Sequence, residues 1–396
     1  ILTGVLTVES GFSYVDINTI GVLIGMMLFV AIVKNSGIFE YIAIKAAKIA
    51  KGRPWPLMLL LCIITAVLSG FLDNVTTVLL IGPMTLAITN MLKTSPVPFF
   101  ITQIMASNIG GTATLIGDPP NIIIGTSLGL SFFDFLGNTG VIAAVCLVFT
   151  VVYFFLCFQK PLAQSEKNRP ADVVYPDAAS AVTNRAGFYG CGASFLVVVV
   201  LLITHAQTEL TVATIGCIAA VLTALAALCT SGGHAAAGLF AKVDYRTLLF
   251  FIGLFVVVSG LEDTGCLDVL AGWISRISGG HTAVMVAIIL WVSAVASAFV
   301  DNIPYTATML PVVGGVAAAL GVDQTVLCFG LLVGATLGGN LTPVGASANI
   351  AACGILRREG YEVSAGQFMR IGVPFTLTAV LTGYVLCWLF YAGLGV

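Results

Sequence analysis

Long apolar blocks decide which solvent this chain can fold in. Residues 20–33, 141–156, 211–229 and 375–391 contain no charged side chain, and as helices the longer blocks can cross a hydrocarbon core of ~30 Å. Only 9% of all residues are charged, against roughly 25% in soluble domains. A soluble fold of this size could not cover its apolar surface, so the sequence predicts an all-α polytopic membrane protein.

The Lys and Arg residues predict how the chain lies in the bilayer. If the segments around Asp73 and Asp301 are re-entrant hairpins that do not cross, every Lys and Arg except Arg276 falls on one side. By the positive-inside rule that side is cytoplasmic. We therefore predict an integral protein of the plasma membrane (the inner membrane in a bacterium), with the hydrophilic 159–187 linker in the cytoplasm and the C-terminus outside. The net charge of −2 leaves no basic surface for nucleic acid.

The sequence matches itself at one offset, 228 residues, which is the separation of Asp73 and Asp301. At this offset residues 71–75 (Phe-Leu-Asp-Asn-Val) meet residues 299–303 (Phe-Val-Asp-Asn-Ile), and several glycines and prolines also coincide. An odd number of predicted crossings separates the two copies, so the second copy enters the membrane from the opposite face. Inverted-topology repeats are the architecture of secondary transporters, whose site near the midplane is exposed alternately to each side.

The repeat divides the chain into four predicted parts: a first inverted repeat (1–158), a cytoplasmic linker (159–187), connecting transmembrane helices (188–245) and a second inverted repeat (246–396). Each repeat is expected to hold a re-entrant hairpin, about Asp73 or Asp301, and a broken transmembrane helix, over 107–121 or 338–349. Gly and Pro are too dense in these two stretches for a continuous helix. We interpret the following glycines as permissive backbone positions: Gly110, Gly111, Gly117, Gly338, Gly339 and Gly345.

Three acidic residues fall within the predicted membrane depth: Asp73, Asp118 and Asp301. No Lys, Arg or His lies in these segments, and a buried carboxylate without a cationic partner marks ion paths or proton relays. We predict that Asp73 and Asp301 couple transport to H⁺ or Na⁺. Asp also caps helix N-termini, which is compatible with coupling. Asp118 is matched by Ala346 at the repeat offset, and Asp before Pro-Pro is an ordinary turn residue, so a site role and a turn role both stay open for it.

The four interruptions are expected to meet at mid-depth and to present helix ends and polar side chains to a solute. The predicted substrate- and ion-binding residues are Asp73, Asn74, Asn108, Thr112, Thr114, Asp118, Asn121, Asp301, Asn302, Asn340, Thr342, Ser347 and Asn349. No cofactor is expected besides the coupling ion, H⁺ or Na⁺. The ten cysteines lack the paired spacing of a zinc or disulfide site, whereas a monovalent cation would fit at Asp73 and Asp301.

At these motifs the sequence resembles the ion transporter superfamily, in particular the group of bacterial arsenite efflux permeases, one class of Na⁺/H⁺ antiporters and the melanosomal P protein. The similar segments are 71–83, 108–121, 300–311 and 338–368. This resemblance implies a scaffold domain, often dimeric, and a transport domain that contains the hairpins and broken helices and moves as an elevator. The chain is more distantly similar to the divalent anion/sodium symporters, whose hairpin tips carry Ser-Asn-Thr.

The replacement of Ser-Asn-Thr by Asp-Asn-Val and Asp-Asn-Ile at the hairpin tips bears on which solute the protein carries. Asp73 and Asp301 add two carboxylates at the tips, which would repel a dicarboxylate and could replace bound Na⁺ with a titratable proton. The resemblance therefore favours an H⁺-coupled exporter of a small hydroxylated solute such as arsenite or antimonite. The alternatives are a Na⁺/H⁺ antiporter and a Na⁺-coupled carboxylate carrier of the citrate type. A channel should show a polar ring, and an intramembrane enzyme a nucleophile or metal set; the acids here follow a repeat instead, so we expect no enzyme.

Overall fold

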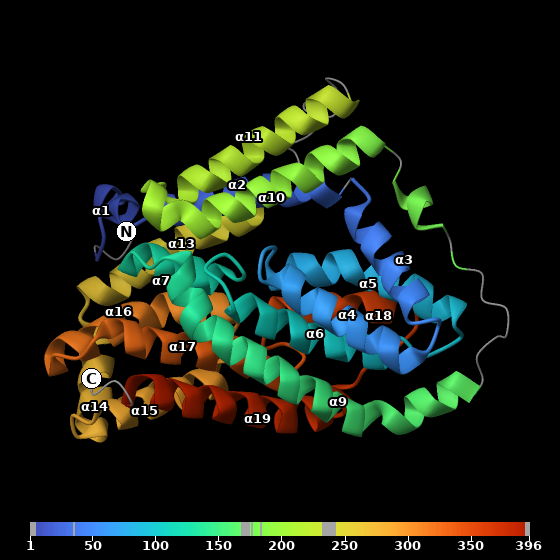
Figure 1. The fold of residues 1–396 in the computed structure, drawn as a ribbon. Helices are drawn as coiled ribbons and strands as arrows, with labels where there is room; N and C mark the ends of the chain where they lie inside the picture. The colour runs from blue at the N-terminus through green and yellow to red at the C-terminus, as the bar shows by residue number, and fades with distance from the viewer. Residues whose placement is uncertain are drawn as a thin grey trace.

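The computed structural model describes residues 5–34, 36–167, 175, 177–182, 184–231 and 243–392. Within these ranges the regular secondary structure is entirely helical (Figure 1). Seven helical segments of the described chain are long and apolar enough to cross a membrane. They are Asn74–Met91 (α5), Phe132–Lys167 (α8, the π-helical turn η1 and α9), Arg185–Thr208 (α10), Tyr245–Asp263 (α13), Asn302–Leu320 (α16), Gln324–Leu341 (α17 with the short 3-10 helix η4) and Ala365–Phe390 (within α19). The predicted all-α polytopic membrane protein is confirmed.

The remaining α-helices of the described chain pack beside these segments. They are α1 (Val8–Ser13), α2 (Ile17–Lys34), α3 (Ile38–Ile49), α4 (Pro54–Ser69), α6 (Val97–Thr112), α7 (Pro119–Leu128), α11 (Val212–Ser231), α14 (Cys266–Ser278), α15 (Thr282–Ser297) and α18 (Ser347–Arg358). Most helices of the first half have a counterpart about 228 residues later, as the repeat predicts. The pairs are α2 and α13, α3 and α14, α4 and α15, α5 and α16, α6 and α17, α7 and α18, and α9 (Val141–Lys167) and α19 (Ala365–Ala392).

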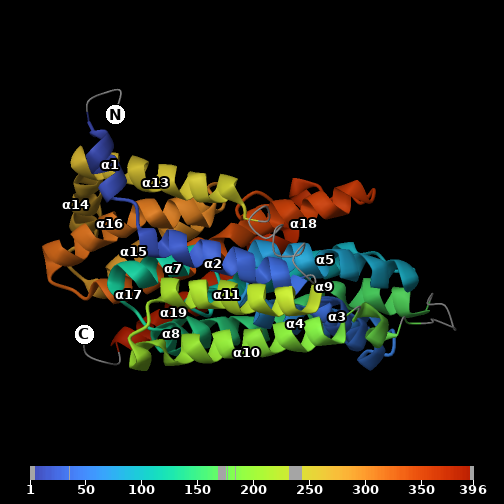
Figure 2. The same cartoon turned by 90° about the horizontal axis from the view of Figure 1, so that it is seen from above.

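Two helical hairpins reach toward the middle of the molecule from opposite ends. The first consists of α4 and α5, which are joined by the turn before Asn74, and it lies toward the right of Figure 1. The second consists of α15 and α16, which are joined by the turn before Asn302, and it lies toward the left in Figure 1 and Figure 2. This arrangement supports the predicted opposite orientation of the two copies.

Two helices are interrupted near the middle of the molecule. The first breaks between α6 and α7, over residues 113–118, and the second between α17 and α18, over residues 339–346. The prolines after Asp118 occupy the first turn of α7, where a missing backbone N–H leaves no hydrogen bond unmade. In both views α7 lies toward one end of the molecule and α18 toward the other (Figure 1, Figure 2).

Glycines let the hairpins touch the broken helices through their backbones. A Cβ atom added at Gly110 would lie 2.0 Å from the Ala66 carbonyl oxygen, so α6 packs directly on α4. The equivalent Gly338 makes the same contact between α17 and α15, where a Cβ would lie 2.4 Å from the Ala294 oxygen. Any larger residue would push the helices apart, since interiors are packed without free space.

The structure differs from the predicted linker at both of its ends. Helix α9 runs on to Lys167, and α10 already begins at Arg185. The extension of α9 is held because Leu162 is buried and because Arg53 Nε lies 2.9 Å from Glu166 Oε1. Residues 168–174, 176 and 183 of the linker, and residues 232–242 of the predicted connecting region, lie outside the described residues.

Candidate functional site

The two hairpin tips meet at the carboxylate of Asp118, which is 0% exposed. Asn302 Nδ2 donates to Asp118 Oδ2 at 2.8 Å, and Asn74 Nδ2 donates to the same oxygen at 3.2 Å. Each of these asparagines begins the second helix of its hairpin, so tips that are far apart in the sequence share one acceptor atom. The structure therefore places Asp118 at the centre of the predicted site.

A second group of amides continues this network across the two broken helices. Asn108 Oδ1 accepts from Asn74 Nδ2 at 3.0 Å, and Asn108 Nδ2 donates to Asn340 Oδ1 at 2.8 Å and to Asn349 Oδ1 at 3.1 Å. All four side chains are buried. The network thus joins α5, α6, the η4 turn and α18, and it includes residues from both halves of the chain.

Contacts between the two halves of the chain occur in matching pairs, in which each residue is replaced by its equivalent in the other copy. Asn108 and Thr336 are equivalent at the offset of 228, and so are Thr112 and Asn340. Asn108 bonds to Asn340, and in the exchanged pair Thr112 Oγ1 donates to Thr336 Oγ1 at 2.8 Å. Exchange of partners is what a two-fold rotation between α6 and α17 produces, and it supports the inverted-repeat prediction.

Four of the predicted site residues hold the backbone of the breaks in shape. The hydroxyl of Thr114 donates to the Gly70 carbonyl at the end of α4, and that of Thr342 donates to the Ala298 carbonyl at the end of α15. Further bonds of this kind come from two asparagine side chains, each of which donates to two main-chain carbonyls: Asn121 to Gly111 (2.8 Å) and Thr114 (2.5 Å), and Asn349 to Gly339 (2.8 Å) and Thr342 (2.8 Å). Freed carbonyls inside a membrane need such partners.

Asp73 and Asp301 cap the second helices of the hairpins. Asp73 Oδ1 accepts from the backbone N–H of Thr76 at 2.8 Å, and Asp301 Oδ1 accepts from that of Ile303 at 3.2 Å. Asp301 Oδ2 also accepts from the hydroxyl of Ser347. The capping role is therefore confirmed for both acids. Both acids are partly buried, whereas Asp118 is 0% exposed.

The predicted glycines act through close contact. None of the six has a positive φ. Gly117 and Gly111 are packed so closely that a Cβ at Gly117 would lie 2.5 Å from the Gly111 oxygen, and Gly345 lies equally close to Gly339, at 2.6 Å. These contacts fold each break back on the end of its own helix, which brings the first residues of α7 and α18 to the centre.

Sequence reasoning missed three residues that shape the site. Thr336 pairs with Thr112, Ser69 Oγ donates to the Ser107 carbonyl at 2.6 Å, and Ser297 Oγ donates to the Ala335 carbonyl at 2.6 Å. Ser69 and Ser297 are equivalent at the repeat offset. A comparison of the small polar residues of the two copies would have found them.

The described part of the chain offers the three central acids no basic partner. The salt bridges seen there are those of Lys48 with Asp177 and of Arg53 with Glu166. The described residues also hold no group of three or more His, Cys, Asp or Glu side chains suited to a metal ion. A buried carboxylate without a basic partner is costly when it is charged.

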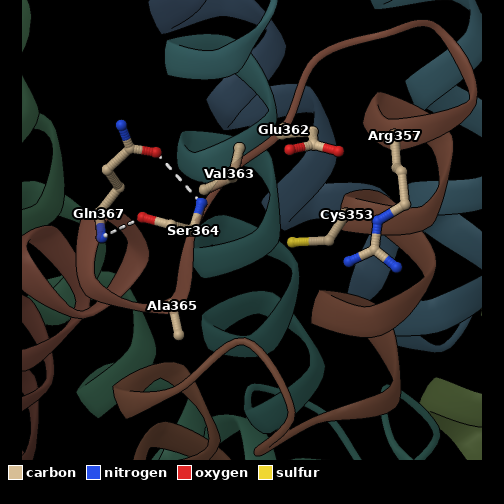
Figure 3. Close-up of a pocket in the computed structure, with 7 residues that line it drawn as sticks. All are labelled: Cys353, Arg357, Glu362, Val363, Ser364, Ala365 and Gln367. Carbon is tan, nitrogen blue, oxygen red and sulfur yellow. Dashed lines mark hydrogen bonds between the residues drawn. The ribbon is translucent and has the colours of Figure 1, made fainter.

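Two pockets lie at the outer ends of the equivalent helices α7 and α18. The larger, about 610 Å³, is lined by Cys353 and Arg357 of α18 and by residues 362–365 and Gln367 at the start of α19. Figure 3 shows this pocket, with the reciprocal hydrogen bonds between Ser364 and Gln367 that cap α19. The smaller, about 320 Å³, is lined by Thr126 and Ser127 of α7, among others. Asp118 lines neither pocket, and its side chain is 0% exposed.

Comparison with known proteins fixes the family. A family model described as citrate transporter matches residues 1–334. The chain belongs to this family. An uncharacterised transporter of Mycobacterium tuberculosis is 38% identical over 95% of this chain and 87% of its own length. The 46 kDa membrane protein of Mycobacterium leprae is 37% identical over the same shares. The human P protein is 29% identical over 96% of this chain and 54% of its own length.

Two solved transporters share the fold. The YdaH transporter of Alcanivorax borkumensis has a TM-score of 0.65 at 17% identity and covers 97% of this chain and 87% of its own. MtrF of Neisseria gonorrhoeae, which is described as illuminating a class of antimetabolite efflux pumps, has a TM-score of 0.63 at 13% identity over 98% of this chain and 83% of its own. The resemblance to the ion transporter superfamily is confirmed, and this family member is a membrane transport protein.

Proposed function

We propose that this protein is a cation-coupled secondary transporter in which the Asp118 carboxylate is the coupling group. The observation that carries the proposal is the sharing of Asp118 Oδ2 by Asn302 and Asn74 (2.8 and 3.2 Å), one from each hairpin tip. A change in the charge of Asp118 therefore changes the strength of the hydrogen bonds from both hairpin tips. Coupling of this kind requires one group in contact with the elements that move.

A proton is the simplest coupling ion for this geometry. A buried carboxylate with no basic partner is costly when charged, and a carboxyl group that is protonated or bound to a cation removes that cost. The two asparagine donors favour the charged form, whereas the neighbouring Asp73 and Asp301 oppose it. Asp73 and Asp301, which the sequence predicts as the coupling residues, act in this proposal as helix caps beside Asp118.

The lining of the site favours a small, uncharged, hydroxylated solute such as arsenous or antimonous acid. The described site is built from Asn, Thr and Asp side chains, which exchange hydrogen bonds with hydroxyl groups. Citrate, which names the matched family, carries several negative charges and would face three carboxylates. We therefore rank proton-coupled export of a neutral oxyacid above citrate transport, and both enter the same flux screen.

A Na⁺/H⁺ antiporter is the second candidate. It is favoured by the oxygen atoms Asp118 Oδ1 and Asn121 Oδ1, which are buried and accept no hydrogen bond in the described structure. Free carboxylate and amide oxygens are ligands that hard cations prefer. In this mechanism Asp118 would exchange a proton for the transported cation.

The surrounding architecture is proposed to work as an elevator in the plasma membrane. Hairpins from opposite ends and broken helices α6–α7 and α17–α18 would form the moving part, with the end that carries Lys45, Lys51 and Lys93 in the cytoplasm. A homodimer through the remaining helices is expected from the resemblance to the superfamily.

Flux measurements on Asp118→Asn test the proposal. The amide has the shape of the carboxyl group and its oxygen can accept from Asn74 and Asn302, so the variant should fold. We expect proteoliposomes of the wild type to move one of arsenite, antimonite, Na⁺, Li⁺ or citrate under an imposed pH gradient, and Asp118→Asn to lose the dependence on that gradient. Asp268→Asn, at an exposed position of α14, is the matched control. Unchanged pH-driven flux in Asp118→Asn would overturn the proposal.

A further inference from the structure

A hydrogen bond joins the start of α2 to α7, the helix that follows the first break. Thr126 Oγ1, near the C-terminal end of α7, donates to Asp16 Oδ2 at 2.9 Å. Asp16 directly precedes α2, and its Oδ1 accepts from the backbone N–H of Asn18 at 2.9 Å, which fixes the carboxylate on α2. The Thr126 hydroxyl also lies 2.8 Å from the Ile122 carbonyl oxygen, but a carboxylate is the stronger acceptor. The hydroxyl proton therefore serves the bond between the two helices.

The second half of the chain builds the same cap at the start of α13. At the offset of 228, Asp16 and Thr19 have the counterparts Asp244 and Thr247. Thr19 Oγ1 donates to Asp16 Oδ2 at 2.5 Å, and Thr247 Oγ1 donates to Asp244 Oδ2 at 2.7 Å. The two caps are equivalent, so their surroundings can be compared directly.

The helices that follow the two breaks are placed differently relative to these caps. α7 packs against α2 (Figure 2), whereas within the described residues α18 has no comparable packing against α13, the counterpart of α2. The counterpart of Thr126 is Gly354 of α18, which has no hydroxyl. Outside its own helix, no described atom lies within 4 Å of a Cβ added at Gly354. The first half is therefore closed at its cap, and the second half is open.

Exchange of these two positions gives the second state of an inverted repeat. Alternating access moves one part of the molecule against the other around a central site, and the two copies are equivalent in opposite orientations. When α7 leaves α2, α18 should therefore approach α13, and Gly354 should come to lie beside the Asp244 cap. That state lacks an equivalent of the present hydrogen bond, because Gly354 supplies no side-chain donor.

The contact borders a space that side chains do not fill. The pocket of about 320 Å³ is lined by Asp16 and Thr126, and also by Phe255 of α13 and Leu310 of α16. Helices that are separated by a pocket lose few van der Waals contacts when they part. A hydrogen bond to a charged group therefore carries more weight at this contact than in a filled interface.

We infer that Asp16 and Thr126 are positioning residues of the transport cycle. Their hydrogen bond favours the state in which α7 lies on α2, and Gly354 leaves the opposite state without such a bond. The inference rests on the proposed movement of the hairpins and broken helices, and it names the residues that set the balance between the two states. It involves neither the coupling ion nor Asp118.

Disulfide formation between Thr247→Cys and Gly354→Cys reports the opposite state in the purified protein. These positions are the counterparts of Thr19 and Thr126, whose hydroxyl oxygens lie 3.1 Å apart. Cysteines whose Cα atoms are more than about 7 Å apart cannot be bridged without backbone movement, so we expect this pair to oxidise slowly. Addition of Thr126→Val, which removes the donor, should raise the initial rate about tenfold, the effect of losing one hydrogen bond to a charged group. Peptide mass spectrometry identifies the disulfide, and the oxidised wild type accounts for the native cysteines.

Two controls separate the hydrogen bond from the fold. Thr126→Ser keeps a hydroxyl on α7 and should leave the rate of disulfide formation unchanged. Thr19→Val removes a hydroxyl that donates to the same carboxylate oxygen but belongs to α2 itself, so it should not raise the rate.

A disulfide between α2 and α7 gives a second measurement, which leaves Gly354 in place. Thr19→Cys/Thr126→Cys should oxidise readily, because the two hydroxyl oxygens are in contact. The disulfide should stop the pH-driven flux of whichever of arsenite, antimonite, Na⁺, Li⁺ or citrate the wild type moves, and reduction should restore it.

Three outcomes would overturn the inference: no disulfide between Thr247→Cys and Gly354→Cys in any background, a rate that Thr126→Val leaves unchanged, or undiminished flux through the oxidised Thr19→Cys/Thr126→Cys protein. A rate raised as much by either control as by Thr126→Val would also overturn it. The proposed function fails separately, since Asp118→Asn tests it through the dependence of flux on the pH gradient, whereas disulfide formation on α13 and α18 requires no gradient and no solute.

Discussion

The contact of α6 with α4 through Gly110 makes a quantitative prediction about stability. A Cβ at this position would lie 2.0 Å from the Ala66 oxygen, whereas non-bonded carbon contacts are best at about 3.5–4.0 Å. Gly110→Ala must therefore move the two helices apart by roughly 1.5 Å. Overpacking of this kind costs about 1–3 kcal/mol, and a backbone oxygen cannot turn away as a side chain can.

The higher helix propensity of Ala offsets about 1 kcal/mol of this cost at most. We expect Gly110→Ala to lose about 2 kcal/mol, since the contact lies near the severe end of the range. Gly338→Ala should behave alike, because its Cβ would lie 2.4 Å from the Ala294 oxygen. Gly253→Ala is the control: no atom lies within 4 Å of its Cβ, so it should be neutral or stabilising.

Thermal unfolding in detergent measures this difference directly. The two variants at the helix contacts should lower the apparent Tm by about 2–3 °C, and the displaced hairpins should reduce flux in proteoliposomes. Wild-type stability in Gly110→Ala, or an equal loss in Gly253→Ala, would show that the helices are not held at backbone contact.

Three further predictions concern the hairpin ends, the orientation and the response to acid. Thr342→Val removes the hydroxyl that donates to the carbonyl at the end of α15 and should cost about 1–3 kcal/mol; an unchanged Tm would contradict this. A membrane-impermeant thiol reagent should label Cys266, which is exposed, from outside the cell and Cys353, which lines the larger pocket, from the cytoplasm; reversed labelling would contradict the predicted orientation. Hydrogen bonds from the side chain and backbone of Thr247 lower the pKa of Asp244, so its contribution to stability is complete above the unfolded pKa of about 3.9 and is lost as pH falls through the lower folded pKa. Asp244→Asn should weaken the acid dependence of unfolding in that window, and identical acid profiles would refute the assignment.

The breaks and the hairpin tips were predictable because they depend on local chemistry. Asp-Asn within an apolar stretch favours a new helix start, because Asp and Asn are preferred N-cap residues, and dense Gly and Pro prevent a continuous helix over 107–121 and 338–349. The offset of 228 then located equivalent positions without knowledge of the fold.

The central place of Asp118 was not predictable from the repeat. Its counterpart is Ala346, so the repeat gives it no support, and its partners Asn74 and Asn302 come together only through tertiary packing. The orientation of the asparagine side chains was equally unpredictable from the sequence. Asn121 turns its Nδ2 atom toward backbone carbonyls, and nothing in a sequence tells such a residue from one that faces a solute.

The C-terminal end of α9 shows, outside the site, the same limit of prediction from the sequence. Residues 159–167 contain Lys, Gln, Glu and Pro and resemble a linker in composition. Burial of Leu162 and the pairing of Glu166 with Arg53 decide in favour of helix, and the ion pair depends on the position of α4, which begins directly after Arg53. Composition describes what a segment prefers alone, and tertiary contacts of a few kcal/mol are enough to override it.

The pairing of Asp118 with Ala346 across the repeat has a thermodynamic consequence for a transporter of the proposed kind. One carboxylate at the centre of the molecule can carry one elementary charge per turnover. Movement of that charge through 100 mV releases about 2.3 kcal/mol, and each tenfold concentration ratio consumes about 1.4 kcal/mol. The membrane potential alone can therefore hold a neutral solute exchanged for one such charge at a ratio of roughly fiftyfold per 100 mV.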